Sequence, residues 1–493
     1  MLLLLLACND TPTDSAARFV PADPSDKPAL RGTGGPSVSF EEAALWENCA
    51  FLAGDPEEER YHHNEVMPYR GHLVMPWAPE YGRGGLSLFE MSDPCNPIKV
   101  GEGFDPLMRE THSMGFVHLR EGDPHAGDYV AVTGNLGVQI WNLTDLDDVH
   151  VESYLPLEGV FYPDSYSRVI LSVFWQYPYV FAAGSDNGIY VVDATDPANP
   201  EFVTQYSWDP VLRAAGVFVI GNTLLVHSAE GSRVAMLDVS DPANPQPIGG
   251  ADFDIVDADG QPREAYHANV AGDWAFFARK EGGGGAMVYD WSDPSKPTKI
   301  GDVFSEGGNG GYVFYDEGFA FVGESHWANV YDMRDMQDIT LVGTGNLAGD
   351  LDTITPYGNV AILSVDDDAQ DQHASAVMPW TRAPDTTGPM VLRVEPRDGS
   401  EGEATSTRIG IGFNEMIEPS SVFAGSVVLE DQDGNAIDGW GSVTENVASF
   451  APKSPLDSGT TYTLRVLPGG IEDLNGNTLE TEFNSSFKTA GVP

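Results

Sequence analysis

The sequence predicts an all-β protein, a seven-bladed β-propeller followed by a small β-sandwich. Three observations lead to this prediction. Within residues 44–384 a short apolar strand, an acidic residue and a proline-rich turn recur in that order. Residues 385–493 lack this repeat but alternate between apolar and polar positions, as half-buried strands do. No segment has a helical period long enough to suggest the crossover helix of a βαβ unit.

Each repeat is a strand core followed by a turn such as Ser240-Asp-Pro-Ala-Asn-Pro245. In this turn Asp bonds to the backbone and Pro fixes φ, so the chain reverses tightly. Successive cores begin 42 to 52 residues apart, close to the spacing of about 40–50 residues in propeller blades. Apolar segments before and after each core complete four short strands, which make one blade. The cores begin at Leu86, Val138, Ile189, Val234, Ala286, Ala328 and Ala376, and the last two are the least regular.

The seventh repeat lacks its outermost strand, because the chain continues into Asp385-Thr-Thr-Gly-Pro389. We expect residues 44–52 to supply this strand and close the ring, which removes exposed sheet edges. Closure would bring Cys49 close to Cys95, which lies in the turn of the first repeat. We predict a disulfide between them in an exported chain; the alternative from sequence is two buried free thiols.

The strand Ile189-Tyr-Val-Val-Asp193 and its counterparts resemble the LVIVD repeat. Chains of such units with different anchoring signals are known as choice-of-anchor surface proteins. The resemblance covers residues 44–384, and three of the seven copies are good matches. It implies an exported bacterial propeller, and it implies no particular activity.

The C-terminal unit is similar to the bacterial Ig-like domains of surface-layer proteins. This resemblance rests on a set of landmarks that covers almost the whole unit. They are Phe413-Asn-Glu-Met-Ile417, Leu456-Asp-Ser-Gly-Thr-Thr-Tyr462, Asp473-Leu-Asn-Gly-Asn477 and Phe487-Lys-Thr489. The resemblance implies a spacer or an adhesive module.

The N-terminal residues predict export and anchoring. Leu5-Leu6-Ala7-Cys8 resembles a bacterial lipobox, so residues 1–8 are interpreted as the remnant of a lipoprotein signal with Cys8 as the lipidated residue. The basic start of a secretory signal is missing, so we expect the true start to lie upstream; an accidental leucine run is the alternative. Residues 9–43 are polar and rich in Pro and Ser, which predicts a flexible tether.

The chain is strongly acidic, with 75 Asp and Glu against 25 Lys and Arg and a formal charge of −50. Such a field repels nucleic acid and anionic lipid headgroups. It attracts cations such as calcium, although a simply solvated surface is the alternative. No later segment approaches about 18 uninterrupted apolar residues, so we expect membrane contact only through the lipid anchor.

A group of histidines is the first candidate site. His63, His112 and His267 lie near the expected starts of the innermost strands in repeats one, two and five, and Asp352 has the matching place in repeat seven. A ring would let these side chains converge at the mouth of the central channel. Three imidazoles and a carboxylate would suit zinc or iron. The alternative is a set of polar channel residues that hold water.

Acidic turns form the second candidate site. Asp254, Asp257 and Asp259 offer closely spaced oxygen ligands for calcium, and the segments 366–368 and 431–435 have a similar composition. None of them fits the twelve-residue calcium loop, because the bidentate Glu is missing. Solvated turns are the alternative.

These observations favour a binding or scaffold protein over an enzyme, at the bacterial outer membrane or cell surface. We expect its partner to be a protein or a polysaccharide and not nucleic acid. The alternative function is that of a metal-dependent propeller hydrolase or lactonase with a histidine site at the channel mouth. A third is a structural coat component held by calcium.

Overall fold

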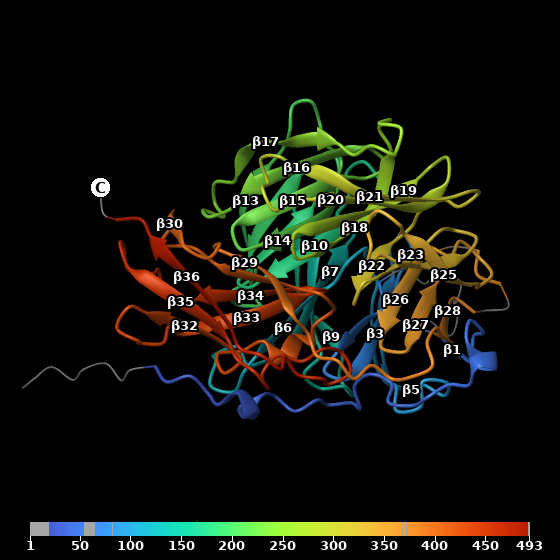
Figure 1. Ribbon diagram of the computed structural model, residues 1–493, viewed down its shortest axis with the longest axis horizontal. Helices are drawn as coiled ribbons and strands as arrows, with labels where there is room; N and C mark the ends of the chain where they lie inside the picture. Colours follow the sequence, from blue (N-terminus) through green and yellow to red (C-terminus); the bar gives the residue numbers. More distant parts are fainter. Residues whose placement is uncertain are drawn as a thin grey trace, which may run out of the picture.

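The computed structural model describes residues 19–53, 65–80, 82–164, 166–366, 368–370 and 373–491. In these residues nearly all regular structure is β-strand. The exceptions are three short 3-10 helices, η1 (Pro24–Asp26), η2 (Glu42–Ala44) and η3 (Pro419–Ser421). None of the described helices has the length and apolar character needed to cross a membrane. Figure 1 shows the strands β29–β36 (orange to red) on one side of a larger set of blades.

Seven four-stranded antiparallel units can be traced in the described residues, and they form the propeller. The first strands of neighbouring blades contact each other from blade two to blade seven, around the central channel. The strands of blades one to three are β2 (Met67–Tyr69), β3 (His72–Trp77), β4 (Gly84–Glu90), β5 (Ile98–Asp105), β6 (Gly115–Leu119), β7 (Gly127–Gly134), β8 (Gly137–Asn142), β9 (His150–Pro156), β10 (Ser172–Gln176), β11 (Tyr179–Ala183), β12 (Ile189–Asp193) and β13 (Glu201–Tyr206). Those of blades four to six are β14 (Ala214–Ile220), β15 (Thr223–Ser228), β16 (Arg233–Asp238), β17 (Gln246–Asp254), β18 (Glu264–Ala271), β19 (Trp274–Lys280), β20 (Gly284–Asp290), β21 (Thr298–Ser305), β22 (Val313–Asp316), β23 (Phe319–Gly323), β24 (Ala328–Asp332) and β25 (Thr340–Gly345).

The seventh blade is completed by the N-terminal part of the chain, as the sequence predicted. It contains β26 (Thr353–Tyr357), β27 (Val360–Ser364), β28 (Ser375–Pro379) and, on the outside, β1 (Ala50–Leu52). The pairing of β1 with β28 is antiparallel, with Phe51 opposite Ala376. A disulfide bond joins Cys49, next to β1, to Cys95 in the turn after β4. The closing strand is therefore covalently tied to blade one.

The blades share a register irregularity that follows from the repeat. In six of them the pairing of the third with the fourth strand shifts near the end of the apolar core, as between Val191 and Val192. Such a β-bulge increases the local twist of the strand. The first two or three strands of each blade are buried, whereas fourth strands such as β5 and β13 are largely exposed. The inner strands of each blade therefore pack against the neighbouring blades, and the fourth strand faces the solvent.

The C-terminal unit is a β-sandwich of two sheets. One sheet contains β29 (Val391–Glu395), β31 (Ile409–Phe413), β34 (Val447–Pro452) and β33 (Gly439–Thr444). The other contains β30 (Ser400–Glu403), β36 (Phe483–Thr489), β35 (Thr461–Val466) and β32 (Val427–Asp431). The first sheet continues into blade two, where Val443 of β33 pairs with Phe116 of β6. The sandwich is therefore joined to the propeller through a shared sheet edge.

The expectation of a flexible tether over residues 9–43 is wrong for its described part, residues 19–43. This segment follows the surface of the sandwich and the propeller (Figure 1). Arg31 Nη1 donates hydrogen bonds to Asp128 Oδ2 at 3.1 Å and to the Leu143 carbonyl at 2.6 Å. The Gly35 amide donates to the Leu474 carbonyl at 2.7 Å. Composition indicates how much apolar surface a segment can bury, but here hydrogen bonds to the folded domains hold the chain.

Candidate functional site

The two ends of the propeller channel differ in what covers them. At one end lie the turns between the first and second strands of the blades, and the sandwich packs against these turns. The Arg70 amide donates to Glu418 Oε1 at 2.9 Å, and the Tyr177 amide donates to Ser442 Oγ at 3.0 Å. We call this end the covered face. The opposite end, which carries the connections from the fourth strand of one blade to the first strand of the next, is called the open face.

Glycines allow the close approach at the covered face. Gly410 and Gly412 of β31 lie against the turns at Gly221 and Gly272, and a Cβ atom on Gly410 would come within 2.0 Å of the Gly221 amide nitrogen. Gly221 and Gly272 also have positive φ values of 58° and 57°, which side chains other than glycine adopt at a cost. The Ile-Gly-Ile-Gly sequence of β31 therefore matches the turns of blades four and five.

On the open-face side of the channel the structure brings together two of the predicted histidines. His112, in the connection between β5 and β6, and His267, in β18, both contact Tyr312, with ring centroids 5.8 Å and 4.6 Å apart. His112 and His267 also line one narrow cavity in the ring, together with His227 and Tyr266. His63 lies outside the described residues. His112 and His267 thus lie close together, as the sequence predicted. His227 lines the same cavity, although the sequence analysis did not single it out.

Burial favours the uncharged form in two of the three cavity histidines, His227 and His267. Burial lowers the pKa of His227 to about 4, and it lowers the pKa of His267 well below its usual value. His227 Nδ1 lies 3.2 Å from the Ser228 carbonyl and therefore carries the proton, because a carbonyl only accepts. Its Nε2 has no hydrogen-bond partner among the described residues. His267 Nδ1 accepts from the Val313 amide at 3.4 Å, and His112 Nε2 contacts Glu110 Oε1. Neutral imidazoles of this kind can bind a metal or accept a hydrogen bond.

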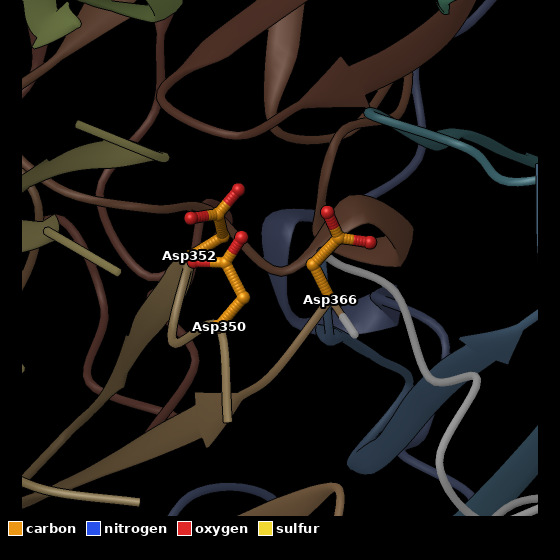
Figure 2. A group of neighbouring side chains, drawn as sticks. All are labelled: Asp350, Asp352 and Asp366. Atoms are coloured by element: carbon orange, nitrogen blue, oxygen red, sulfur yellow. The ribbon is translucent and has the colours of Figure 1, made fainter. Parts of the chain in front are cut away.

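Asp352, the predicted fourth ligand, belongs to a different group. Its backbone carbonyl accepts from the Tyr312 amide at 2.7 Å, but its carboxylate gathers with those of Asp350 and Asp366. One oxygen of each of the three lies within 4.8 Å of the others. Figure 2 shows Asp350 and Asp352 together before β26 and Asp366 across from them, after β27. We call these three residues the mouth triad. A set of oxygen donors suits calcium or magnesium better than zinc, so the predicted mixed site is divided into imidazoles and carboxylates.

A glutamate of the propeller, Glu65, and one of the sandwich, Glu445, interact inside the channel. Glu445, at the tip of the β33–β34 turn of the sandwich, has a φ of 53° and lines the same cavity as His227. Its carboxylate accepts from Asn269 Nδ2, and Glu65 Oε2 accepts from the Met114 amide at 2.7 Å. Burial raises the pKa of Glu445 to about 7 and that of Glu65 well above its usual value. No local motif indicates this pair, because its members lie far apart in the sequence.

The predicted calcium turn is stabilised by the chain itself. Asp257 Oδ1 accepts from the amides of Asp259 and Gln261, and its Oδ2 accepts from Arg263 Nε at 2.6 Å. The Gln261 amide, followed by the Arg263 pair, lowers the pKa of Asp257 to about 2. Asp254 accepts from Ser232 Oγ at 2.7 Å. Within the described residues Asp254, Asp257 and Asp259 are not among the groups of three carboxylates that lie within 4.8 Å of one another. The turn has its own ion pair, and calcium binding there stays a prediction.

A closed ring of four-stranded blades with a sandwich on one face defines a β-propeller protein with an attached Ig-like module. The family described as bacterial Ig-like domain matches residues 385–489. The family described as LVIVD repeat matches residues 176–207, which include the third strand core. The chain is an LVIVD-repeat β-propeller with a C-terminal bacterial Ig-like domain.

A curated relative is the S-layer protein of Geobacillus stearothermophilus, which is 27% identical over 155 residues. The match covers 30% of this chain but only 11% of the relative. Among solved structures, the β-propeller domain of Myceliophteria_thermophila Cps50 (Swd1) has 12% identity and a TM-score of 0.45, covering 64% of this chain and 97% of that chain. The periplasmic gluconolactonase PpgL of Pseudomonas aeruginosa has 12% identity and a TM-score of 0.43, covering 57% and 84%. At these identities the likeness concerns the fold alone.

Proposed function

We propose that this protein is a bacterial cell-surface binding protein that presents the open face of its propeller to a polysaccharide or a protein. The Ig-like domain serves as the base on the covered face. A lipid on Cys8, which lies outside the described residues, would supply the anchor, as in choice-of-anchor surface proteins. The likeness of part of the chain to an S-layer protein supports a surface location.

The main observation behind this proposal is the unequal use of the two faces. The covered face is occupied by the Ig-like domain through buried polar contacts such as Arg408 Nη2 to the Val239 carbonyl at 2.6 Å. At the open face the mouth triad brings together one carboxylate oxygen from each of three residues, and the charge of Asp352 acts on the nearby Tyr266 and Tyr312. Carboxylates accept hydrogen bonds from sugar hydroxyls or bind a cation that bridges to them. Polar groups that converge on a cavity with aromatic side chains are typical of a ligand site.

The test is co-sedimentation of the purified protein with cell envelopes isolated from the producing bacterium, with calcium or with chelator. We expect saturable binding that becomes about tenfold or more weaker when Asp350→Asn and Asp366→Asn are combined. The matched control combines Glu201→Gln, on the outer strand of blade three, with Asp433→Asn, in a sandwich turn. Both side chains are exposed, and this control should bind like the wild type. Absence of binding to envelopes, or equal binding by the mouth variant, would contradict the proposal.

The second candidate function is a metal-dependent hydrolase or lactonase. Its support is the cavity shared by His112, His227 and His267, two of which burial keeps uncharged. Three neutral imidazoles form the ligand set of many catalytic zinc sites. Metal analysis of the purified protein tests this candidate. Stoichiometric zinc or iron that is lost in His267→Ala, together with lactone hydrolysis, would favour the enzyme over the binding protein.

A further inference from the structure

Four acidic side chains meet where the Ig-like domain adjoins blades six and seven. Asp316 ends β22, Asp385 lies in the linker, Glu415 follows β31, and Asp473 lies between β35 and β36. One oxygen each of Asp385, Glu415 and Asp473 lies within 4.8 Å of the others. We call these three residues the junction triad. Glu415 is 3% exposed and Asp473 is 2% exposed, so the group is largely removed from water.

The junction triad lines a cavity of about 180 Å³ together with Asp316, Glu317 and Trp380. Among the described residues that line this cavity there is no lysine, arginine or histidine. Carboxylates in such a place are costly unless a proton or a cation neutralises them. A bound cation or proton in this cavity would therefore be stabilised by the surrounding carboxylates.

Glu415 supplies a second observation, which concerns its hydrogen bonding. Among the described residues its carboxylate accepts a hydrogen bond at Oε1 only, from Asn414 Nδ2 at 3.2 Å, although the residue is 3% exposed. A carboxylate oxygen in a side chain this buried normally has a donor. Asp473, by contrast, is oriented by the amides of Asn475 and Asn477, each at 2.8 Å, and by Asn477 Nδ2 at 2.8 Å. Asn477 Nδ2 also donates to Asp385 Oδ2 at 3.2 Å. Two ligands are thus held in place, while Glu415 lines the cavity with this one donor among the described residues.

We propose that the junction triad binds one calcium ion, with Asp316 as a further ligand or as a partner of a bound water. The donors are all oxygens, and calcium accepts six to eight oxygen ligands in flexible geometry, with water completing the shell. The ion would join a strand end of blade six to the linker and to two segments of the Ig-like domain. It would therefore fix the orientation of that domain on the propeller. This site is separate from the mouth triad and does not depend on ligand binding at the open face.

The test measures metal binding to the full chain after treatment with chelator. Terbium is the luminescent probe, because Trp380 lines the cavity and can sensitise a bound lanthanide. Calcium titration by calorimetry gives the affinity. We expect terbium emission excited through tryptophan, displaced by calcium, and an affinity at one site that is about tenfold or more weaker in Glu415→Gln. Asp433→Asn, an exposed acid of the same domain, is the control and should bind like the wild type.

Folding of each variant is checked by far-UV circular dichroism, and Asp385→Asn, at a half-buried position, serves as a second variant. Two results would overturn the proposal. One is the absence of saturable calcium or terbium binding to the folded wild type. The other is calcium binding that is unchanged in both folded variants, which would assign the ion to another place such as the mouth triad.

Discussion

The covered face and the open face of the propeller are built from the same repeat, yet they differ in their connections. Six of the seven first-to-second strand turns have only two residues between the strands, as at Gly221-Asn222 and Gly272-Asp273. The connections at the open face are longer, and the one from β25 to β26 spans residues 346–352. Short turns give a regular surface on which a second domain can dock, whereas longer connections gather side chains from several blades.

The two acidic triads show the same contrast. Both bring three carboxylate oxygens within 4.8 Å of one another. In the junction triad two members are buried between domains, whereas in the mouth triad Asp350 is exposed and Asp366 is partly exposed. Water can solvate a charge at the mouth, but the junction must acquire a proton or an ion. The charges of the mouth triad therefore need no bound ion for the fold to be stable. Those of the junction triad must be neutralised when the Ig-like domain packs on the propeller.

The largest effect is expected from loss of a buried cation at the covered face. Arg408 is 4% exposed and donates to Gln176 Oε1 and to the Val239 carbonyl. Arg408→Ala leaves both acceptors without this donor, so we expect the free energy of unfolding to fall by about 4 kcal/mol. Urea unfolding measures it. Arg334→Ala removes an exposed ion pair with Asp332 and should have a far smaller effect. Equal losses of stability in the two variants would contradict this difference between a buried and an exposed arginine.

Acidification should lower the free energy of unfolding through the buried histidine His227 in the channel. The folded pKa of His227, about 4, lies below its unfolded value of 6.5, so the unfolded state binds more protons between these values. The stabilisation is present above pH 6.5 and is lost as the pH falls toward 4. For His227→Gln we expect a loss of stability between pH 7 and pH 5 that is smaller by about 2 kcal/mol than for the wild type. Urea titrations at both pH values test this, and parallel losses would show that the pKa of His227 does not differ between the folded and unfolded states.

Without metal, the junction triad should respond in the opposite direction. Burial raises the pKa of Glu415, so its contribution to stability is present below its unfolded value of 4.5 and is lost as the pH rises through the folded value. In chelator at pH 8 we expect Glu415→Gln to raise the free energy of unfolding by about 2 kcal/mol. Below about pH 4.5 the difference should vanish. Thermal unfolding across this range measures it, and a destabilised variant in chelator at pH 8 would contradict the interpretation.

The smallest effect on stability is expected at the mouth triad. Asp350 is exposed, so Asp350→Asn should change the free energy of unfolding by less than about 0.5 kcal/mol. Urea unfolding measures this change alongside the envelope-binding assay. A large loss of stability at Asp350 would mean that the mouth triad, like the junction triad, is part of the structural framework.

Several features were accessible from the sequence because local patterns determine them. The apolar cores with Asp-Pro turns predicted the blades, and the missing strand of the seventh repeat predicted its completion by β1. The matching positions of His112 and His267 within repeats two and five predicted their approach to the channel. Each inference used a period or a position within a repeat, which sequence displays directly.

Other features were not accessible. Asp350 and Asp366 meet only because two loops of blade seven fold over the same space. Glu445 reaches the channel only because the β33–β34 turn fits into it, where Asn269 Nδ2 donates to its carboxylate. The segment 19–43 has the composition of a tether, but partners such as Asp128 hold it on the surface. These contacts depend on shape and distance between segments that share no pattern.

The sequence by itself determined the class of the protein, the number of its repeats and the closure of the ring, since turn chemistry and strand alternation act over a few residues. Only the tertiary structure decided which propeller face is covered, which imidazoles lose their charge and where the acids gather. These outcomes depend on burial and on distances between remote segments. The fit of Gly410 against Gly221 is such a contact, because neither glycine indicates the other until the domains are docked.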